Sequence, residues 1–173
     1  MSNIAEAAVS MAEAQAYARV ETGEEEALLA GLVRTASALC ESFTGLVLVA
    51  RPFEEVLPPG GQWQRLGLTP VRAIEEVAAL AVDGSATVLP IGEYEIDIDS
   101  RGDGWVRTIS GDKKLRVRGQ AGMAVEPNGV PEPLRQGILR LIAHFFTTRD
   151  GSGGEPPAAV TALWRPYRRM RLA

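Results

Sequence analysis

The side chains best suited to nucleophilic or acid–base chemistry occur once each in this sequence, at Cys40 and His144. A reactive thiol needs a base within hydrogen-bond reach and a third group that orients the base. Cys40 instead continues an apolar stripe at helical spacing, where a small buried hydrophobe is typical, and His144 stands beside Phe145 in a second such stripe. We therefore expect no catalytic residues, no cofactor and no enzyme activity.

Acidic residues in the middle of the chain raise the question of a metal site. Asp97-x-Asp99 followed by Gly102 resembles the start of a calcium-binding loop. The fifth position of that loop is Arg101 and the twelfth is Thr108, where an oxygen ligand and a bidentate glutamate are required. Because the chain also has one cysteine and one histidine, we expect neither a metal site nor a disulfide framework.

Arginine dominates the end of the chain, with four among the last nine residues. Apolar and aromatic residues are interleaved with them; such residues gain nothing in a solvated tail, whereas Arg and Tyr are enriched at protein–protein interfaces. Three interpretations stay open: an interface arm, a helix end packed on its own domain, and contact with nucleic acid. The candidate partner-binding residues are Trp164, Arg165, Pro166, Tyr167, Arg168, Arg169, Arg171 and Leu172.

Apolar residues at helical spacing predict the elements that position these groups. Helices are expected over about 10–20, because that segment is rich in helix-forming residues, and over about 23–43 and 132–148 from this spacing. The stripe of the second helix comprises Leu28, Leu29, Leu32, Val33, Ala36, Leu39, Cys40 and Phe43. The stripe of the third comprises Leu134, Ile138, Leu141, Ile142 and Phe145. Both stripes indicate helices that pack against a core.

A small antiparallel β unit is predicted over about 46–125. Asp83-Gly84 is typical of a tight hairpin turn, and Tyr94, Ile96 and Ile98 alternate with acidic residues as in a half-buried strand. The segment 70–80 fits either a strand or a short helix. The predicted fold class is therefore α+β, with a mostly helical core, this β unit inserted between the helices, and an extended C-terminal arm.

The Gly-rich run after the last predicted helix sets the domain organisation. We expect a single domain over 1–150, a linker over 151–157 and an arm over 158–173. Because no apolar stripe continues into the arm, removal of 164–173 is expected to leave the domain folded.

Composition and charge limit the function further. The 173 residues carry 18 Lys and Arg against 22 Asp and Glu, a net charge of −4, which disfavours a basic coat for nucleic acid. The charge is uneven: residues 1–30 have six Glu and one Arg, whereas residues 131–173 have seven Arg and three acidic residues. Such polarity can orient subunits head to tail. No apolar run reaches the ~20 residues that span a bilayer, so we expect no membrane contact.

Several fragments, in their order and spacing, are similar to the phage head–tail connector (adaptor) family, which also occurs in prophages and gene transfer agents. The fragments are Glu13-Ala14-x-x-Tyr17-x-Arg19-Val20, Glu41-x-x-Thr44-Gly45, Leu68-x-Pro70-Val71, Tyr94-x-Ile96-Asp97, Val130-Pro131-x-x-Leu134-Arg135 and Leu163-x-x-Pro166-Tyr167-Arg168-x-x-Arg171-Leu172. Together they extend over most of the chain.

The resemblance implies a structural role at the head–tail junction of a virion or phage-like particle assembled in the bacterial cytoplasm. The family implies a ring, expected to be dodecameric, that lies under the portal protein, contacts a tail-side connector or stopper protein, and lets DNA pass through its bore without specific binding. It also implies that the C-terminal arm docks on the portal. The alternative is a small DNA-binding or DNA-packaging accessory protein that uses the Arg-rich tail.

Overall fold

The computed structural model describes residues 7–19, 25–148 and 155–169. The chain divides into two compact units: a helical unit formed by Met1–Val49 with Ala124–Ala173, and a β unit formed by Ala50–Met123. Arg171 and Leu172 of the expected arm lie outside the described residues. Among the helices that the structure describes, none has the length and apolar character to span a bilayer.

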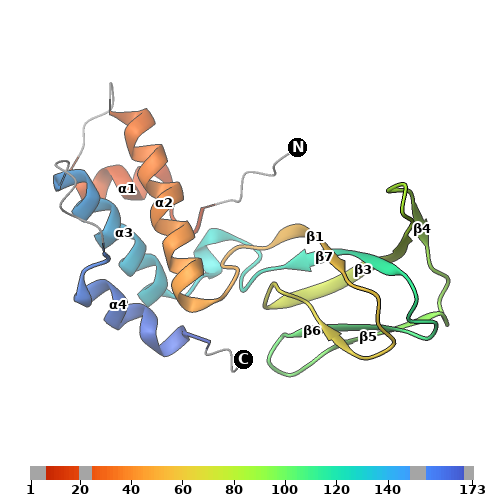
Figure 1. The fold of residues 1–173 in the computed structure, drawn as a ribbon. Helices are drawn as coiled ribbons and strands as arrows, with labels where there is room; N and C mark the ends of the chain where they lie inside the picture. Colours follow the sequence, from red (N-terminus) through yellow and green to blue (C-terminus); the bar gives the residue numbers. More distant parts are fainter. Residues whose placement is uncertain (1–6, 20–24, 149–154, 170–173) are drawn as a thin grey trace. The chain divides into compact units, whose positions relative to one another are not determined.

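The helical unit contains α1 (Met11–Ala18), α2 (Glu26–Thr44), α3 (Glu132–Thr147) and α4 (Ala158–Trp164), with short 3-10 turns at Pro127–Gly129 and Arg165–Tyr167 (Figure 1). A capping box begins α1: the Ser10 hydroxyl accepts from the Glu13 amide at 3.2 Å, and the Glu13 carboxylate accepts from the Ser10 amide at 2.8 Å. Helix α2 ends at Gly45, whose φ of 71° is the left-handed conformation that favours glycine.

The apolar stripes of α2 and α3 form the core of this unit. The buried residues of the two helices include Leu29, Val33, Ala36, Cys40, Leu134, Ile138, Leu141 and Ile142. Arg135 on α3 joins α1 to this core, since its guanidinium forms an ion pair with Glu13 and donates to the Ala8 carbonyl at 3.2 Å.

The β unit consists of two antiparallel sheets that lie one over the other in Figure 1. The first has the order β1-β7-β3-β4 and the second the order β2-β6-β5. The strands are β1 (Arg51–Leu57), β2 (Gln64–Arg65), β3 (Val71–Leu80), β4 (Ala86–Val88), β5 (Tyr94–Ile98), β6 (Gly104–Thr108) and β7 (Lys114–Ala121). Inward residues such as Val77, Val106 and Val117 are almost completely buried, so the unit has its own core.

The predicted hairpin is confirmed: β3 pairs with β4 across Asp83-Gly84, and Gly84 has a φ of 85°. Segment 70–80, for which the sequence allowed either a strand or a short helix, is strand β3.

Gly119 allows the close approach of β3 and β7. A Cβ on Gly119 would lie 2.1 Å from the Ala73 carbonyl oxygen, where the β3–β7 register shifts, so only glycine allows this close approach.

The expected helix-dominated fold is wrong. The described residues are 37% helical and 28% strand, and the strands form two sheets in place of a small insertion. The reason is that strands of both sheets carry buried apolar side chains, among them Val77, Val106 and Val117, which makes the β portion a compact unit with its own core. The C-terminal arm is not extended either, because Ala158–Trp164 is helix α4 and a 3-10 turn follows it.

Candidate interaction surfaces

The C-terminal segment contains the candidate docking residues, and the structure buries the first of them. Trp164, at the end of α4, has no exposed surface. Its indole Nε1 donates to the Leu134 carbonyl at 3.2 Å, and its ring lies 5.9 Å from the Phe43 ring, centroid to centroid. Gly137 makes room for the indole, since a Cβ there would lie 2.1 Å from Nε1. Trp164 therefore anchors the segment to α2 and α3.

The residues after Trp164 contact the C-terminal end of α2. The Arg169 amide donates to the Thr44 carbonyl at 2.8 Å, and the Arg168 guanidinium lies 5.3 Å from the centroid of the Phe43 ring. Arg165, Pro166 and Arg168 are exposed, while Tyr167 and Arg169 are half-buried. Two exposed arginines, Arg165 and Arg168, thus lie on a segment that packing on the helical unit holds in place.

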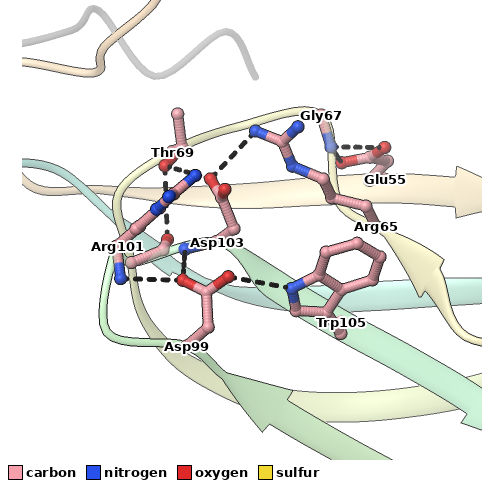
Figure 2. Close-up of polar contacts among 9 residues, drawn as sticks. Glu55, Arg65, Gly67, Thr69, Asp99, Arg101, Asp103 and Trp105 are labelled. Carbon is pink, nitrogen blue, oxygen red and sulfur yellow. Dashed lines mark hydrogen bonds and ion pairs between the residues drawn. The ribbon is translucent and has the colours of Figure 1, made fainter. Parts of the chain in front are cut away.

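A second group of polar residues lies in the β unit, around the turn between β5 and β6 (Figure 2). Asp103 is 8% exposed. Its Oδ1 accepts from the Arg65 guanidinium at 3.0 Å and from the Thr69 hydroxyl at 2.9 Å. These contacts join the end of β2, the segment before β3 and the start of β6.

Asp99 closes the same turn. Its Oδ1 accepts from the amides of Arg101 and Asp103 at 2.8 and 3.0 Å, and its Oδ2 accepts from the Trp105 indole at 3.3 Å (Figure 2). The hydrogen bond from the Asp103 amide is the main reason that the pKa of Asp99 lies below its ordinary value. The residue that resembles a calcium ligand in the sequence thus holds a turn through hydrogen bonds to protein groups.

Cys40 and His144, whose side-chain types can act in nucleophilic or acid–base catalysis, lie on different helices of the helical unit. Cys40 is fully buried on α2, and burial raises the pKa of its thiol, so a thiolate is disfavoured. His144 lies on α3 with its ring 6.0 Å from the Phe145 ring, centroid to centroid. Within the described parts of the chain, no group of three or more Cys, His, Asp or Glu side chains is arranged to hold a metal ion.

The structure also shows exposed apolar side chains in the β unit, which sequence reasoning did not identify as an interaction surface. Val82 and Val88, with Leu80 and Leu89, line an open groove of about 820 Å³ whose wall also carries Lys113. Ile96 and Ile98 on β5 are 44% and 38% exposed. Alternating sequence patterns mark such residues as inward-facing, but they do not show whether another layer covers them.

Comparison with known proteins gives likenesses of fold. No protein-family model and no curated protein sequence matches the chain. A chain in the neck of an empty GTA particle, computed with C6 symmetry, matches with a TM-score of 0.77 and 23% identity over 96% of this chain and 92% of that one.

Two further structures have the same fold. A chain in the virion of a native gene transfer agent (GTA) particle matches with a TM-score of 0.75 and 22% identity, covering 96% of this chain and 92% of that one. A chain in the neck of a native GTA particle, computed with C12 symmetry, gives 0.72 and 19%, covering 97% and 96%. The likeness covers nearly the full length on both sides, so the arrangement of helices and sheets is that of these neck and virion chains.

Proposed function

We propose that this chain is the subunit of a head–tail connector, a ring at the vertex of a phage-like particle that joins the portal to the tail and lets DNA pass through its bore. The observation that carries the proposal is the fold shared over 96% of the chain with a GTA neck chain at a TM-score of 0.77. The proposed location is the head–tail junction of a virion or gene transfer agent particle, after assembly in the bacterial cytoplasm.

The proposed assembly is a homo-oligomeric ring of twelve copies. The related neck structures were computed with C6 and C12 symmetry, and C12 contains C6. A ring of identical subunits closes through heterologous contacts, in which two different surfaces of the subunit meet. In the sequence, acidic residues gather toward the N-terminus and arginines toward the C-terminus, and this polarity can orient the subunits in the ring.

The proposed contact with the portal is the C-terminal segment. Arg165 and Arg168 are exposed, and Trp164 fixes the segment that carries them. Guanidinium groups held in place lose less conformational entropy when they bind carboxylates of a partner than groups on a free tail. A tail-side connector or stopper protein is the proposed second partner.

Electron microscopy of the protein mixed with the portal protein of a related particle tests the proposal. We expect a ring, seen end-on, on the portal. The double variant Arg165→Glu with Arg168→Glu should abolish attachment. The matched control, Arg34→Glu with Arg140→Glu, makes the same charge change at exposed sites on α2 and α3 and should attach normally. Absence of any portal complex from the unmodified protein would contradict the proposal.

The alternative function, DNA binding or packaging through the Arg-rich segment, predicts a different result. Binding to phosphates weakens steeply with salt, because each neutralised phosphate releases counterions. Two results together would support the accessory protein. The unmodified protein would bind DNA in a salt-dependent way that the Arg165→Glu, Arg168→Glu variant loses, and it would not attach to the portal. We expect no such binding, because the net charge is −4.

A further inference from the structure

Strand β5 (Tyr94–Ile98) ends the three-stranded sheet of the β unit, in the order β2-β6-β5. It pairs on one side with β6, from Tyr94 opposite Thr108 to Ile98 opposite Gly104. Among the residues that the structure describes, no strand pairs with its other side.

The hydrogen bonds at the two ends of this pairing show which backbone groups face the open side. The Asp99 amide donates to the Asp103 carbonyl at 3.0 Å, and the Ile109 amide donates to the Glu93 carbonyl at 3.1 Å. In an antiparallel ladder, hydrogen-bonded and non-hydrogen-bonded pairs alternate. The odd-numbered residues of β5 therefore bond to β6. The even-numbered residues, at positions 94, 96 and 98, direct their N–H and C=O groups to the open edge.

The other sheet edges of the β unit are protected, and β5 is not. Strand β1 contains Pro52, which has no N–H, and its Glu55 carboxylate accepts from the Gly67 amide at 2.9 and 3.0 Å, which brings a loop against that strand. Strands β2 and β4 have only two and three residues. Strand β5 has five residues without proline or glycine, which is long enough to pair with an added strand.

The side chains of β5 indicate what such a strand would carry. Ile96 and Ile98 share a face with the buried Val106 and Gly104, yet remain 44% and 38% exposed, so an added strand could cover them with apolar side chains. The opposite face carries Glu95 and Asp97. Glu95 already forms an ion pair with Arg107 on β6.

Asp97 completes the acidic face. It is exposed and has no ion-pair or hydrogen-bond partner for its side chain within the described residues. Its cross-strand neighbour on β6 is Trp105, which leaves the open side for a cation. Two copies of β5 paired with each other would bring like charges together, which disfavours self-association through this edge.

We propose that the open edge of β5 is a docking site for an extended segment of a partner protein in which Lys or Arg alternates with apolar residues. The segment adds a fourth strand to the β2-β6-β5 sheet. Its backbone pairs with residues 94, 96 and 98, its apolar side chains cover Ile96 and Ile98, and its cations lie beside Asp97. This site is separate from the C-terminal segment proposed to contact the portal.

The test uses the full-length protein and a synthetic peptide, Arg-Val-Arg-Val-Arg-Val, as the probe. Amide exchange measured by NMR should slow at Tyr94, Ile96 and Ile98 when the peptide binds, while the amides of Glu95 and Asp97, already bonded to β6, change little. A peptide of the same composition arranged as three Val followed by three Arg is the control and should not produce this alternation. Equal protection of all five amides, or none with the alternating peptide, would overturn the proposal.

Two variants separate the backbone contribution from the charge contribution. Ile96→Pro removes one edge donor at a position where an edge strand tolerates proline, and should weaken peptide binding about fivefold. Asp97→Lys replaces attraction by repulsion and should weaken it about tenfold. The control Glu75→Lys, at an exposed position of β3 in the other sheet, should bind as the unmodified protein does. Unchanged binding by the Asp97→Lys variant would refute the basic partner.

The protein measured alone identifies a competing occupant. Protection of the three edge amides that grows with protein concentration would show that a second copy occupies the edge and would overturn the assignment to a partner protein. Fast exchange of these amides at every concentration is the expected result. Because ring formation on a portal is a separate readout, failure of this site leaves the connector proposal to its own test.

Discussion

The burial of Trp164 gives the sharpest prediction about this protein. The residue has no exposed surface, its Nε1 donates to the Leu134 carbonyl, and its ring lies against Phe43. We expect Trp164→Ala to lower the free energy of unfolding of the helical unit by about 3–5 kcal/mol, the range for large aromatic residues replaced by alanine in a core. Trp164→Phe keeps most of the apolar contact and should cost less.

Gly137 gives a second prediction: the effect of Gly137→Ala on the free energy of unfolding should change sign when Trp164 is replaced. A Cβ at position 137 would lie 2.1 Å from the indole Nε1 and 2.8 Å from two further ring atoms of Trp164. Gly137→Ala alone should therefore destabilise by about 1–3 kcal/mol through overpacking, although alanine favours a helix over glycine by about 1 kcal/mol. In the Trp164→Ala background the obstacle is gone, so the same substitution should stabilise by up to about 1 kcal/mol.

Urea unfolding of the four proteins in this cycle, followed by far-UV circular dichroism, measures these values. The helical signal reports mainly on the unit that contains residue 164. A loss of less than about 1 kcal/mol for Trp164→Ala would show that the residue is not part of a packed core. An equal cost of Gly137→Ala in both backgrounds would refute the contact between the two positions.

The same burial changes what truncation is expected to do. The sequence suggests that residues 164–173 can be removed without harm to folding, because no apolar stripe continues into them. The structure overturns this expectation, since the removed segment includes Trp164. Deletion of 164–173 should lower the melting temperature as much as Trp164→Ala does, whereas deletion of 170–173 should leave Trp164 and its contacts in place. Equal melting temperatures for the two deletions would contradict this.

Two further predictions concern polar contacts. Ser10→Ala removes a helix cap and should cost about 1 kcal/mol in urea unfolding. The cap, chiefly the hydrogen bond from the Ser10 amide, lowers the pKa of Glu13 in the folded state. Ser10→Ala keeps this amide and removes only the hydroxyl, which also donates to the Glu13 carboxylate at 3.0 Å. The contribution of the hydroxyl is present above the pKa that Glu13 has in the unfolded chain and is lost as the pH falls through the folded pKa, so a small part of the cost of Ser10→Ala should disappear in acid. Asp103→Ala leaves the Thr69 hydroxyl without this acceptor and should destabilise the β unit by about 2 kcal/mol, measured by the fluorescence of its tryptophans.

Short sequence patterns predicted the features that depend only on neighbouring residues, such as the hairpin at Asp83-Gly84. Asp83-Gly84 predicts a hairpin because glycine adopts positive φ and aspartate bonds to nearby amides. Both features are present: Gly84 has a φ of 85°, and the Asp83 carboxylate accepts from the Ser85 amide at 2.9 Å. The capping box at Ser10 and Glu13 has an equally local signature, a serine followed three residues later by a glutamate.

The burial of Trp164 in the candidate docking segment depends on residues far from it in the sequence, so a local sequence pattern cannot predict it. Trp164 is buried because Gly137, on a different helix, leaves space for its ring, and because Phe43 on α2 lies beside it. Neither partner is near Trp164 in the sequence. A tryptophan followed by arginines is therefore equally consistent with an exposed anchor and a core residue, and only the fold distinguishes them.

The β5 edge shows a related limit. Tyr94, Ile96 and Ile98 alternate with acidic residues in the same way whether a strand lies at the centre of a sheet or at its end, because side-chain alternation follows from the backbone alone. Position in the sheet decides whether the backbone groups of those residues are already paired. In this unit the side chains able to bind ions, Asp99 and Asp103, are engaged by turn amides and by Arg65, whereas the edge of β5 keeps its backbone groups available. The capacity of the β unit for recognition thus comes from its topology, and residue types refine it by setting the charge that an added strand must carry.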